Sequence, residues 1–161
     1  MTISVGDKLP AANFAVMGPD GPGSRDGSEI FNGRTVVLFA VPGAFTPTCH
    51  MKHLPGFLEN FDALKAKGVD EIACTAVNDI FVHDAWGKAS NIGDKITMLA
   101  DGSGTFAKAV GLDLDLDEAG LGLRSQRYAM LVDDGVVKVM NVEEVASKAE
   151  ASSAEKILAA L

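Results

Sequence analysis

The sequence predicts an α/β fold, in which strands and helices alternate along one domain that spans residues 1–161. A continuous apolar run, TVVLFAV at residues 35–41, is typical of a strand buried on both faces. Apolar residues at helical spacing follow it, and strand and helix patterns continue to alternate further along the chain. A chain of 161 residues, 47% of them hydrophobic, is also long enough for one well-filled core.

The first expected elements precede and follow Cys49. The turn-forming segment GPDGPGSRDG at residues 18–27 predicts a surface loop before the buried strand at 35–41. After Cys49 a helix is expected, because apolar residues recur at helical spacing: Leu54, Phe57, Leu58, Phe61 and Leu64. Pro55 predicts a kink in this helix, and Gly68 predicts its end.

The second half of the chain continues the alternation and closes on a hairpin and a helix. Strand and helix patterns follow one another over EIACTAV at 71–77, DIFVHDAWGKAS at 79–90, KITMLAD at 95–101 and GTFAKAVGL at 104–112. The segment at 127–142 predicts a β-hairpin that turns at 134–135. The segment at 152–161 predicts a closing helix, in which Ser152 and Glu155 have capping-box spacing.

Charge and composition argue against several classes of protein. The chain has 14 basic and 22 acidic residues and a net charge of -8, and its basic residues are scattered, which argues against a nucleic-acid or anionic-lipid partner. The opening MTISVGDKLP has no apolar signal-peptide core, and no apolar stretch is long enough to cross a membrane. We therefore expect a cytoplasmic protein, in which two cysteines are poor candidates for a permanent disulfide.

The position of Cys49 predicts a reactive thiol. Thr46 suits the N-cap of the following helix and Pro47 its first position, so Cys49 falls in the first turn. Unpaired backbone N–H groups and the helix dipole stabilise a thiolate there. The site also follows the buried strand at 35–41, and open α/β sheets bind ligands at the carboxyl ends of their strands. The alternative is a buried cysteine that happens to begin a helix.

The residues around this cysteine resemble those of the peroxiredoxins. Pro42, Thr46 and Cys49 reproduce the Pro-x-x-x-Thr-x-x-Cys motif of that family. The segments VVLFAVPGAFTPTC, KHLPGF, VND, AWGK, GLGLRSQRYAMLVDDG and SSAEKIL extend the resemblance to type II, or five-type, members along nearly the full chain. The resemblance implies a thioredoxin-like fold with a central mixed sheet flanked by helices. It also implies a thiol-dependent peroxidase that reduces hydrogen peroxide and alkyl hydroperoxides.

The same resemblance implies a role for each site residue. Cys49 would be the attacking thiolate, which becomes a sulfenic acid, and the Thr46 hydroxyl would hydrogen-bond the peroxide. Pro42 would shield the pocket, and Arg127 of SQRYAM matches the active-site arginine of the family. Without the resemblance, Arg127 would be interpreted as the partner of a carboxylate. No cofactor and no metal are expected.

The resemblance also bears on partners and on the second cysteine. It implies regeneration by glutaredoxin with glutathione or by thioredoxin, and a homodimer. The spacing of Cys49 and Cys74 resembles the cysteine pair of plant-type members, which makes Cys74 a possible resolving cysteine. The neighbours of Cys74 in EIACTAV are apolar on both alternating faces, which favours a buried structural thiol instead. No cysteine follows Cys74, so we expect that an external thiol can resolve the sulfenic acid directly.

Several other features have two interpretations. Cys49, His50 and His53 could form part of a zinc or copper site, although no fourth ligand with suitable spacing is evident. The run DLDLDE at 113–118 resembles the start of a calcium loop, but Glu118 and Arg124 replace residues that such a loop requires, so a solvated loop is expected.

The helix predicted at 79–90 and the activity class also leave alternatives. Trp86 and Phe81 are expected in the core or at a subunit contact, and His83 on the surface of its helix. A thioredoxin-like disulfide reductase is disfavoured because the chain has no Cys-x-x-Cys. A non-catalytic peroxide sensor or chaperone on the same fold stays open, since a sensor also needs a reactive Cys49.

Overall fold

The computed structural model describes residues 1–161 and has a seven-stranded mixed sheet with the order β2-β1-β5-β4-β3-β8-β9. Its strands are β1 (Asn13–Gly18), β2 (Gly21–Asp26), β3 (Thr35–Ala40), β4 (Glu71–Ala76), β5 (Thr97–Ala100), β8 (Tyr128–Asp133) and β9 (Val136–Val142). Strand β3 pairs in parallel with β4 and antiparallel with β8, and β4 pairs in parallel with β5. The predicted α/β fold with a central mixed sheet is thereby confirmed, as is the hairpin formed by β8 and β9.

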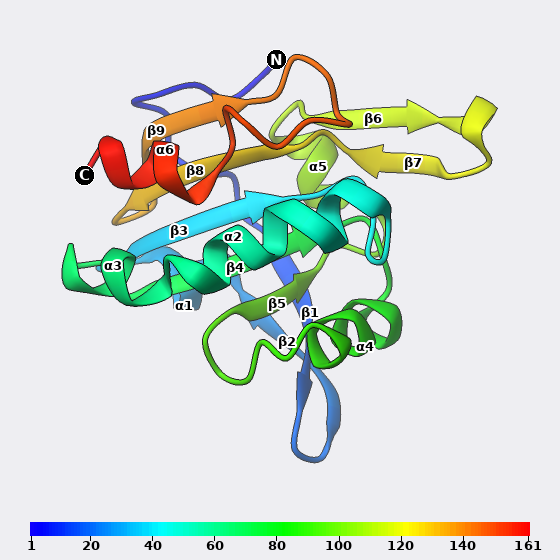
Figure 1. Cartoon of the computed structure of the whole chain (residues 1–161), viewed down its shortest axis with the longest axis horizontal. Helices are drawn as coiled ribbons and strands as arrows, with labels where there is room; N and C mark the ends of the chain where they lie inside the picture. The colour runs from blue at the N-terminus through cyan, green and yellow to red at the C-terminus, as the bar shows by residue number, and fades with distance from the viewer.

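Helices cover both faces of this sheet (Figure 1). One face packs against α2 (Leu54–Glu59), α3 (Phe61–Ala66), α4 (Ile80–Ala89) and α6 (Ala154–Ala159), and the other against α1 (Gly27–Phe31) and α5 (Thr105–Ala109). Strand β3 serves both cores, because successive side chains of a strand point to opposite faces. Its Val37 and Phe39 join the first core, whereas Val36 and Leu38 join the second.

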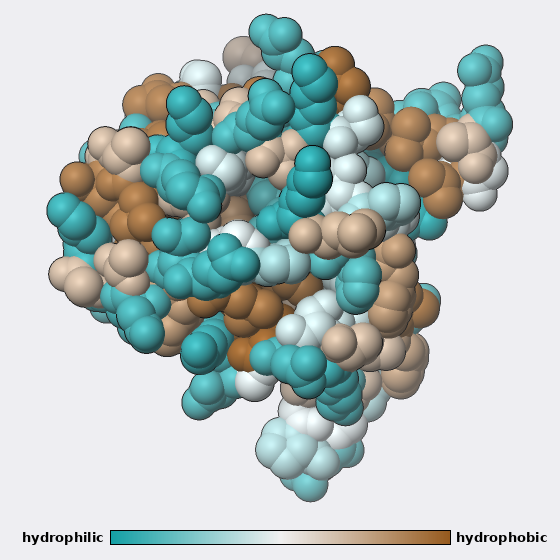
Figure 2. Space-filling model, viewed as in Figure 1, coloured by the Kyte–Doolittle hydropathy of each residue, from teal (hydrophilic) through white to brown (hydrophobic).

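Two segments that the sequence predicts as loops are strands. Residues 18–27 contribute to the β1–β2 hairpin, and the acidic run forms β6 (Asp113–Leu116), which pairs with β7 (Gly122–Ser125) across the 3-10 turn η2 (Asp117–Ala119). Both hairpins project from the body of the molecule in Figure 1, and the tip of the β1–β2 hairpin is hydrophilic in Figure 2. Strand β2 lies at the sheet edge, where its polar and glycine-rich sequence is tolerated.

The helix after Cys49 is not the single kinked helix that the sequence predicts. It begins with a π-helical turn, η1 (Cys49–His53), in which the N–H of Leu54 donates to the carbonyl of Cys49. Leu54, whose N–H closes this turn, is followed by Pro55, which has no N–H to continue the α-helical ladder. A second break at Asn60 then separates α2 from α3.

Two predictions for side chains of the helices are wrong. Ser153, rather than Ser152, caps α6, since its hydroxyl accepts from the N–H of Lys156 at 3.3 Å. His83 is fully buried rather than exposed, and its Nε2 lies 2.9 Å from the carbonyl of Cys74. Burial lowers the pKa of His83 to about 4, so the ring is neutral and donates this bond.

The two aromatic residues of α4 divide between core and surface. Trp86 is fully buried, as predicted, whereas Phe81 is 63% exposed and therefore does not belong to the core of the chain. The face of α4 that meets the sheet carries Ile80, His83, Trp86 and Gly87, which recur at helical spacing. None of the helices is both long enough and apolar enough to cross a bilayer.

Candidate active site

The loop that joins β3 to Cys49 is held from two directions. The N–H of Ala44 donates to Asn78 Oδ1, beyond the end of β4, at 2.8 Å. Arg124 Nη1 donates to the carbonyl of Pro42 at 3.4 Å. These contacts fix the loop at the carboxyl end of the buried strand, where the sequence predicts the site.

Two hydrogen-bond donors converge on the buried sulfur of Cys49. The Thr46 hydroxyl and Arg127 Nη2 each lie 2.9 Å from Cys49 Sγ. The side chain is fully buried, and it occupies the first turn of η1. The guanidinium can only donate, so the sulfur accepts from Arg127.

Thr46 begins the helix, but its side chain faces the sulfur. The N–H of His50 donates to the carbonyl of Thr46 at 2.9 Å, which places the start of the helix where the sequence predicts it. The Thr46 hydroxyl lies 2.7 Å from the carbonyl of Gly43 and 2.9 Å from Cys49 Sγ. The hydroxyl therefore contacts the sulfur and the Gly43 carbonyl rather than the free N–H groups that a capping side chain would serve.

Arg127 lies immediately before β8 and is 2% exposed. Its Nε donates to the carbonyl of Ala146 at 2.9 Å, its Nη1 lies 3.0 Å from His53 Nδ1, and its Nη2 faces Cys49. None of the three salt bridges of the structure involves it. The alternative in which Arg127 simply pairs with a carboxylate is therefore wrong.

His53 is held between this arginine and a backbone carbonyl. Its Nε2 lies 2.9 Å from the carbonyl of Ser152, which can only accept, and its Nδ1 faces a guanidinium, which can only donate. The proton therefore resides on Nε2. Burial, and next the charge of Arg127, lower the pKa of His53 to about 3, so the ring is neutral at pH 7.

These contacts also bear on the metal alternative. The lone pair of His53 is directed at Arg127, and His50 Nδ1 accepts from Trp86 Nε1 at 3.1 Å. Both ring nitrogens of His53, and Nδ1 of His50, are therefore occupied by protein partners. The geometry thus provides no support for a zinc or copper site built from Cys49, His50 and His53.

Comparisons with known proteins decide the family. A family model described as Redoxin matches residues 4–158. The chain is 52% identical over 170 residues to peroxiredoxin-2E-2, chloroplastic, of Oryza sativa subsp. japonica, covering 99% of this chain and 73% of the relative. It is 48% identical over 160 residues to peroxiredoxin-2B of Arabidopsis thaliana, covering 99% of this chain and 98% of the relative. The chain belongs to the peroxiredoxin family.

Solved structures agree with this assignment. Reduced Prx3 in complex with hydrogen peroxide from Vibrio vulnificus is 52% identical and superposes with a TM-score of 0.93 over 99% of each chain. A putative thioredoxin reductase from Burkholderia cenocepacia is 45% identical, with a TM-score of 0.96 over 100% of this chain and 99% of the other. The thioredoxin-like fold is thereby confirmed, and this peroxiredoxin is a thiol-dependent peroxidase, an oxidoreductase.

The second thiol of this peroxiredoxin is buried in the core, as its apolar neighbours predict. Cys74 lies on β4, paired with Phe39 on β3, and is fully buried. Cys49 and Cys74 belong to the same core cluster, and both are free thiols. Burial, with a smaller contribution from Cys49, raises the pKa of Cys74 well above its ordinary value.

Sequence reasoning missed a second arginine beside the site. Besides contacting Pro42, Arg124 donates from Nε to the carbonyl of Leu121 at 2.8 Å. Its guanidinium packs so closely on the loop that a Cβ at Gly43 would lie 2.9 Å from Nη1. Its position in the segment GLGLRSQRYAM, which also contains Arg127, is the only sequence signal for this contact.

Proposed function

We propose that Cys49 is the peroxidatic cysteine and that its thiolate attacks one oxygen of a hydroperoxide. A bond forms between Sγ and that oxygen as the O–O bond breaks, so the sulfur loses two electrons and becomes a sulfenic acid. The leaving oxygen takes up a proton and departs as water from hydrogen peroxide, or as an alcohol from an alkyl hydroperoxide. The convergence of Thr46 and Arg127 on Sγ carries this proposal.

The donors beside Cys49 then act chiefly by alignment. An ordinary thiol is already a few per cent ionised at pH 7, so complete ionisation can raise the rate only about 30-fold. Preorganised donors and correct orientation can contribute several kcal/mol more, because they act on charge that develops in the transition state. In this scheme the Thr46 hydroxyl and Arg127 hold the peroxide oxygens, and the buried Pro42 shields the pocket from water.

We propose that an external thiol regenerates the enzyme, with glutaredoxin and glutathione or thioredoxin as the source. Two free, fully buried cysteines support this route, because neither thiol forms a disulfide in the folded chain. The experiment is a coupled assay of peroxide consumption with each reducing system in turn. Sustained turnover with at least one system is expected. A single stoichiometric oxidation with no turnover under either would contradict the peroxidase proposal and favour a sensor.

Replacing Cys74 with serine should leave most of the activity supported by glutaredoxin and glutathione. Because Cys74 lies inside β4, it would reach Cys49 only after local unfolding. Direct attack of glutathione on the sulfenic acid of Cys49 does not require Cys74. Thioredoxin-supported activity should fall further, since that route benefits from an intramolecular disulfide. Both coupled assays, run on a variant with a native circular dichroism spectrum, measure this. Equal collapse of both activities would make Cys74 an obligate resolving cysteine.

We propose a homodimer that forms through the apolar surface beside the active-site loop. Phe45 is 49% exposed and Phe81 63% exposed, and the loop of the first is tied to the segment before the second by the bond between Ala44 and Asn78. Brown and tan side chains gather along this edge in Figure 2, where Figure 1 places the loop before η1 and helix α4. Such exposed apolar patches are typical of interaction sites.

Replacing Phe81 with aspartate should therefore shift the protein from dimer to monomer. A charge introduced at a buried apolar contact is left without a partner, which disfavours association. Light scattering coupled to gel filtration measures the mass. Val5→Asp is the matched control, because Val5 is also well exposed, at 60%, but lies near the N-terminus. A wild-type monomer, or equal dissociation of both variants, would contradict the proposed interface.

We further propose that residues 1–161 act as one domain in the cytoplasm. The seven-stranded sheet includes both the first strand of the chain, β1, and the last, β9, which supports a single cooperative unit. The two free thiols fit a reducing compartment. Separate unfolding transitions would contradict the single domain. Recovery of the protein mainly in an organelle fraction would contradict the cytoplasmic location.

A further inference from the structure

The active-site arginine belongs to a closed ring of hydrogen bonds that passes through the segment between β9 and α6. This segment, residues 143–152, is called the strap. The N–H of Glu143 donates to the carbonyl of Arg127 at 3.0 Å, and Glu143 Oε2 accepts from Ser152 N and Oγ at 2.6 and 2.5 Å. The carbonyl of Ser152 accepts from His53, whose other nitrogen accepts from Arg127 Nη1.

The strap thereby governs the direction of the guanidinium. It provides the Ala146 carbonyl for Arg127 Nε directly, and it holds Nη1 indirectly through Ser152 and His53. A planar guanidinium anchored at two nitrogens has little freedom to turn. Its third nitrogen, Nη2, is then directed at Cys49 Sγ.

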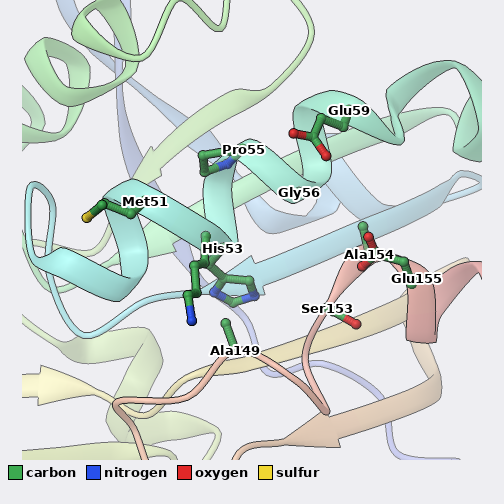
Figure 3. Close-up of a pocket in the computed structure, with 10 residues that line it drawn as sticks. Met51, His53, Pro55, Gly56, Glu59, Ala149, Ser153, Ala154 and Glu155 are labelled. Atoms are coloured by element: carbon green, nitrogen blue, oxygen red, sulfur yellow. The ribbon is translucent and has the colours of Figure 1, made fainter.

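Hydrogen bonds, rather than apolar packing, hold the strap beside η1. The ring members Arg127, His53, Glu143 and Ser152 are all buried, whereas the strap between its two ends is exposed or half-buried. A hollow of about 300 Å³ separates the end of the strap from η1 and α2, and His53 and Ser153 are among its lining residues. Figure 3 shows the His53 ring on the helix side of this hollow, with Ala149 and Ser153 of the C-terminal segment across from it.

We propose that Glu143 is a positioning residue for peroxide reduction, because its carboxylate closes the strap and so directs Arg127 toward Cys49. The carboxylate forms two bonds to Ser152, and charge-assisted bonds of this kind are the stronger ones. Without it, the Ser152 carbonyl, which orients His53 and through it Arg127 Nη1, loses its tie to the start of the strap, whereas the middle of the strap keeps the bond from Thr48 Oγ1 to the Ser147 carbonyl at 2.8 Å. This inference rests on the proposed function, since it requires that Arg127 acts on the reacting atoms.

Replacing Glu143 with alanine should slow oxidation of Cys49 by about 10- to 100-fold, the effect typical of misplacing a catalytic group by about 1 Å. The measurement is rapid mixing of the reduced enzyme with hydrogen peroxide, followed through the fluorescence of Trp86, the only tryptophan. Glu143→Gln retains an acceptor and should recover much of the rate. Glu144→Ala is the matched control, because this neighbouring glutamate is exposed, and it should react like the wild type.

A double-mutant cycle distinguishes positioning from general destabilisation. If Glu143 acts through Arg127, then adding Glu143→Ala to Arg127→Gln should change the rate no more than about twofold. An equal slowing in both backgrounds would overturn the proposal, as would a wild-type rate for Glu143→Ala. Should Glu143→Ala not fold, Ser152→Ala in the same cycle removes the hydroxyl bond alone, and a smaller slowing that depends on Arg127 is expected.

The same cycle separates failure of this inference from failure of the proposed function. A near wild-type rate for Arg127→Gln alone would contradict the role of the arginine and the inference with it. A slow Arg127→Gln beside a fast, folded Glu143→Ala would contradict only the positioning role of Glu143.

Discussion

Replacing Cys49 with serine is expected to lower peroxide consumption by at least about 1,000-fold, because removing a catalytic nucleophile typically has effects of that size or larger. A serine hydroxyl does not ionise near neutral pH, so it cannot replace the thiolate. Cys74 cannot take over the reaction either, since it is fully buried and burial raises its pKa. The substitution is nearly isosteric, and the hydroxyl oxygen can still accept from Thr46 and Arg127, so the fold should persist.

The matched control is Cys74→Ser, which removes the other thiol and should still react with peroxide. Peroxide loss is measured with excess reductant, and thermal unfolding shows that both variants are folded. A folded Cys49→Ser variant that consumes peroxide at a rate near the wild type would mean that the reactive atom lies elsewhere.

Replacing Arg127 with glutamine is expected to slow oxidation of Cys49 by more than the roughly 30-fold that complete thiolate formation can supply. Glutamine has no charge and cannot donate simultaneously to Cys49, His53 and Ala146, as the guanidinium does. The variant should also lose about 1–3 kcal/mol in free energy of unfolding, because buried acceptors are left without donors.

Two quantities measured on the same samples test the role of Arg127. Thiolate absorbance across pH gives the ionised fraction of Cys49, and rapid mixing gives its rate of oxidation. A slowing that the thiolate fraction fully explains would contradict the alignment role. Arg25→Gln is the control, since Arg25 is half-buried and its guanidinium is also bonded, at 2.9 Å to Glu71, but it lies on the edge strand β2, away from Cys49.

The sequence predicted those strands and hairpins that contain an apolar run or a turn-forming pair of residues. The apolar run became β3, and the 127–142 segment became a hairpin that turns near Gly135, where φ is 77°. Strands β2 and β6 carry no comparable apolar run, and they form because a neighbouring strand supplies the backbone partners. The burial of His83 was accessible from its spacing with Ile80 and Trp86 on one helix face.

The candidate site was predictable in its residues but not in its geometry. Thr46 and Cys49 are close in sequence, so neighbouring residues are enough to predict the start of the helix that brings them together. The contacts of Arg127 with His53 and Ala146 join segments that are distant in sequence, and the bond between Ser152 and Glu143 closes an irregular segment of the chain. The spacing of apolar residues in the sequence does not predict such contacts. The π-helical turn also depends on how Pro55 is accommodated within the packed chain.

The most direct test of the central claim is to identify the atom that peroxide oxidises first. The fully reduced protein is mixed with one equivalent of hydrogen peroxide in the presence of dimedone, which traps sulfenic acids, and the peptides are analysed by mass spectrometry. We expect one adduct per chain, on the Cys49 peptide, with Cys74 still a free thiol. Consumption of the peroxide with the adduct on Cys74, or with the added oxygen on methionines and Cys49 unmodified, would contradict the account.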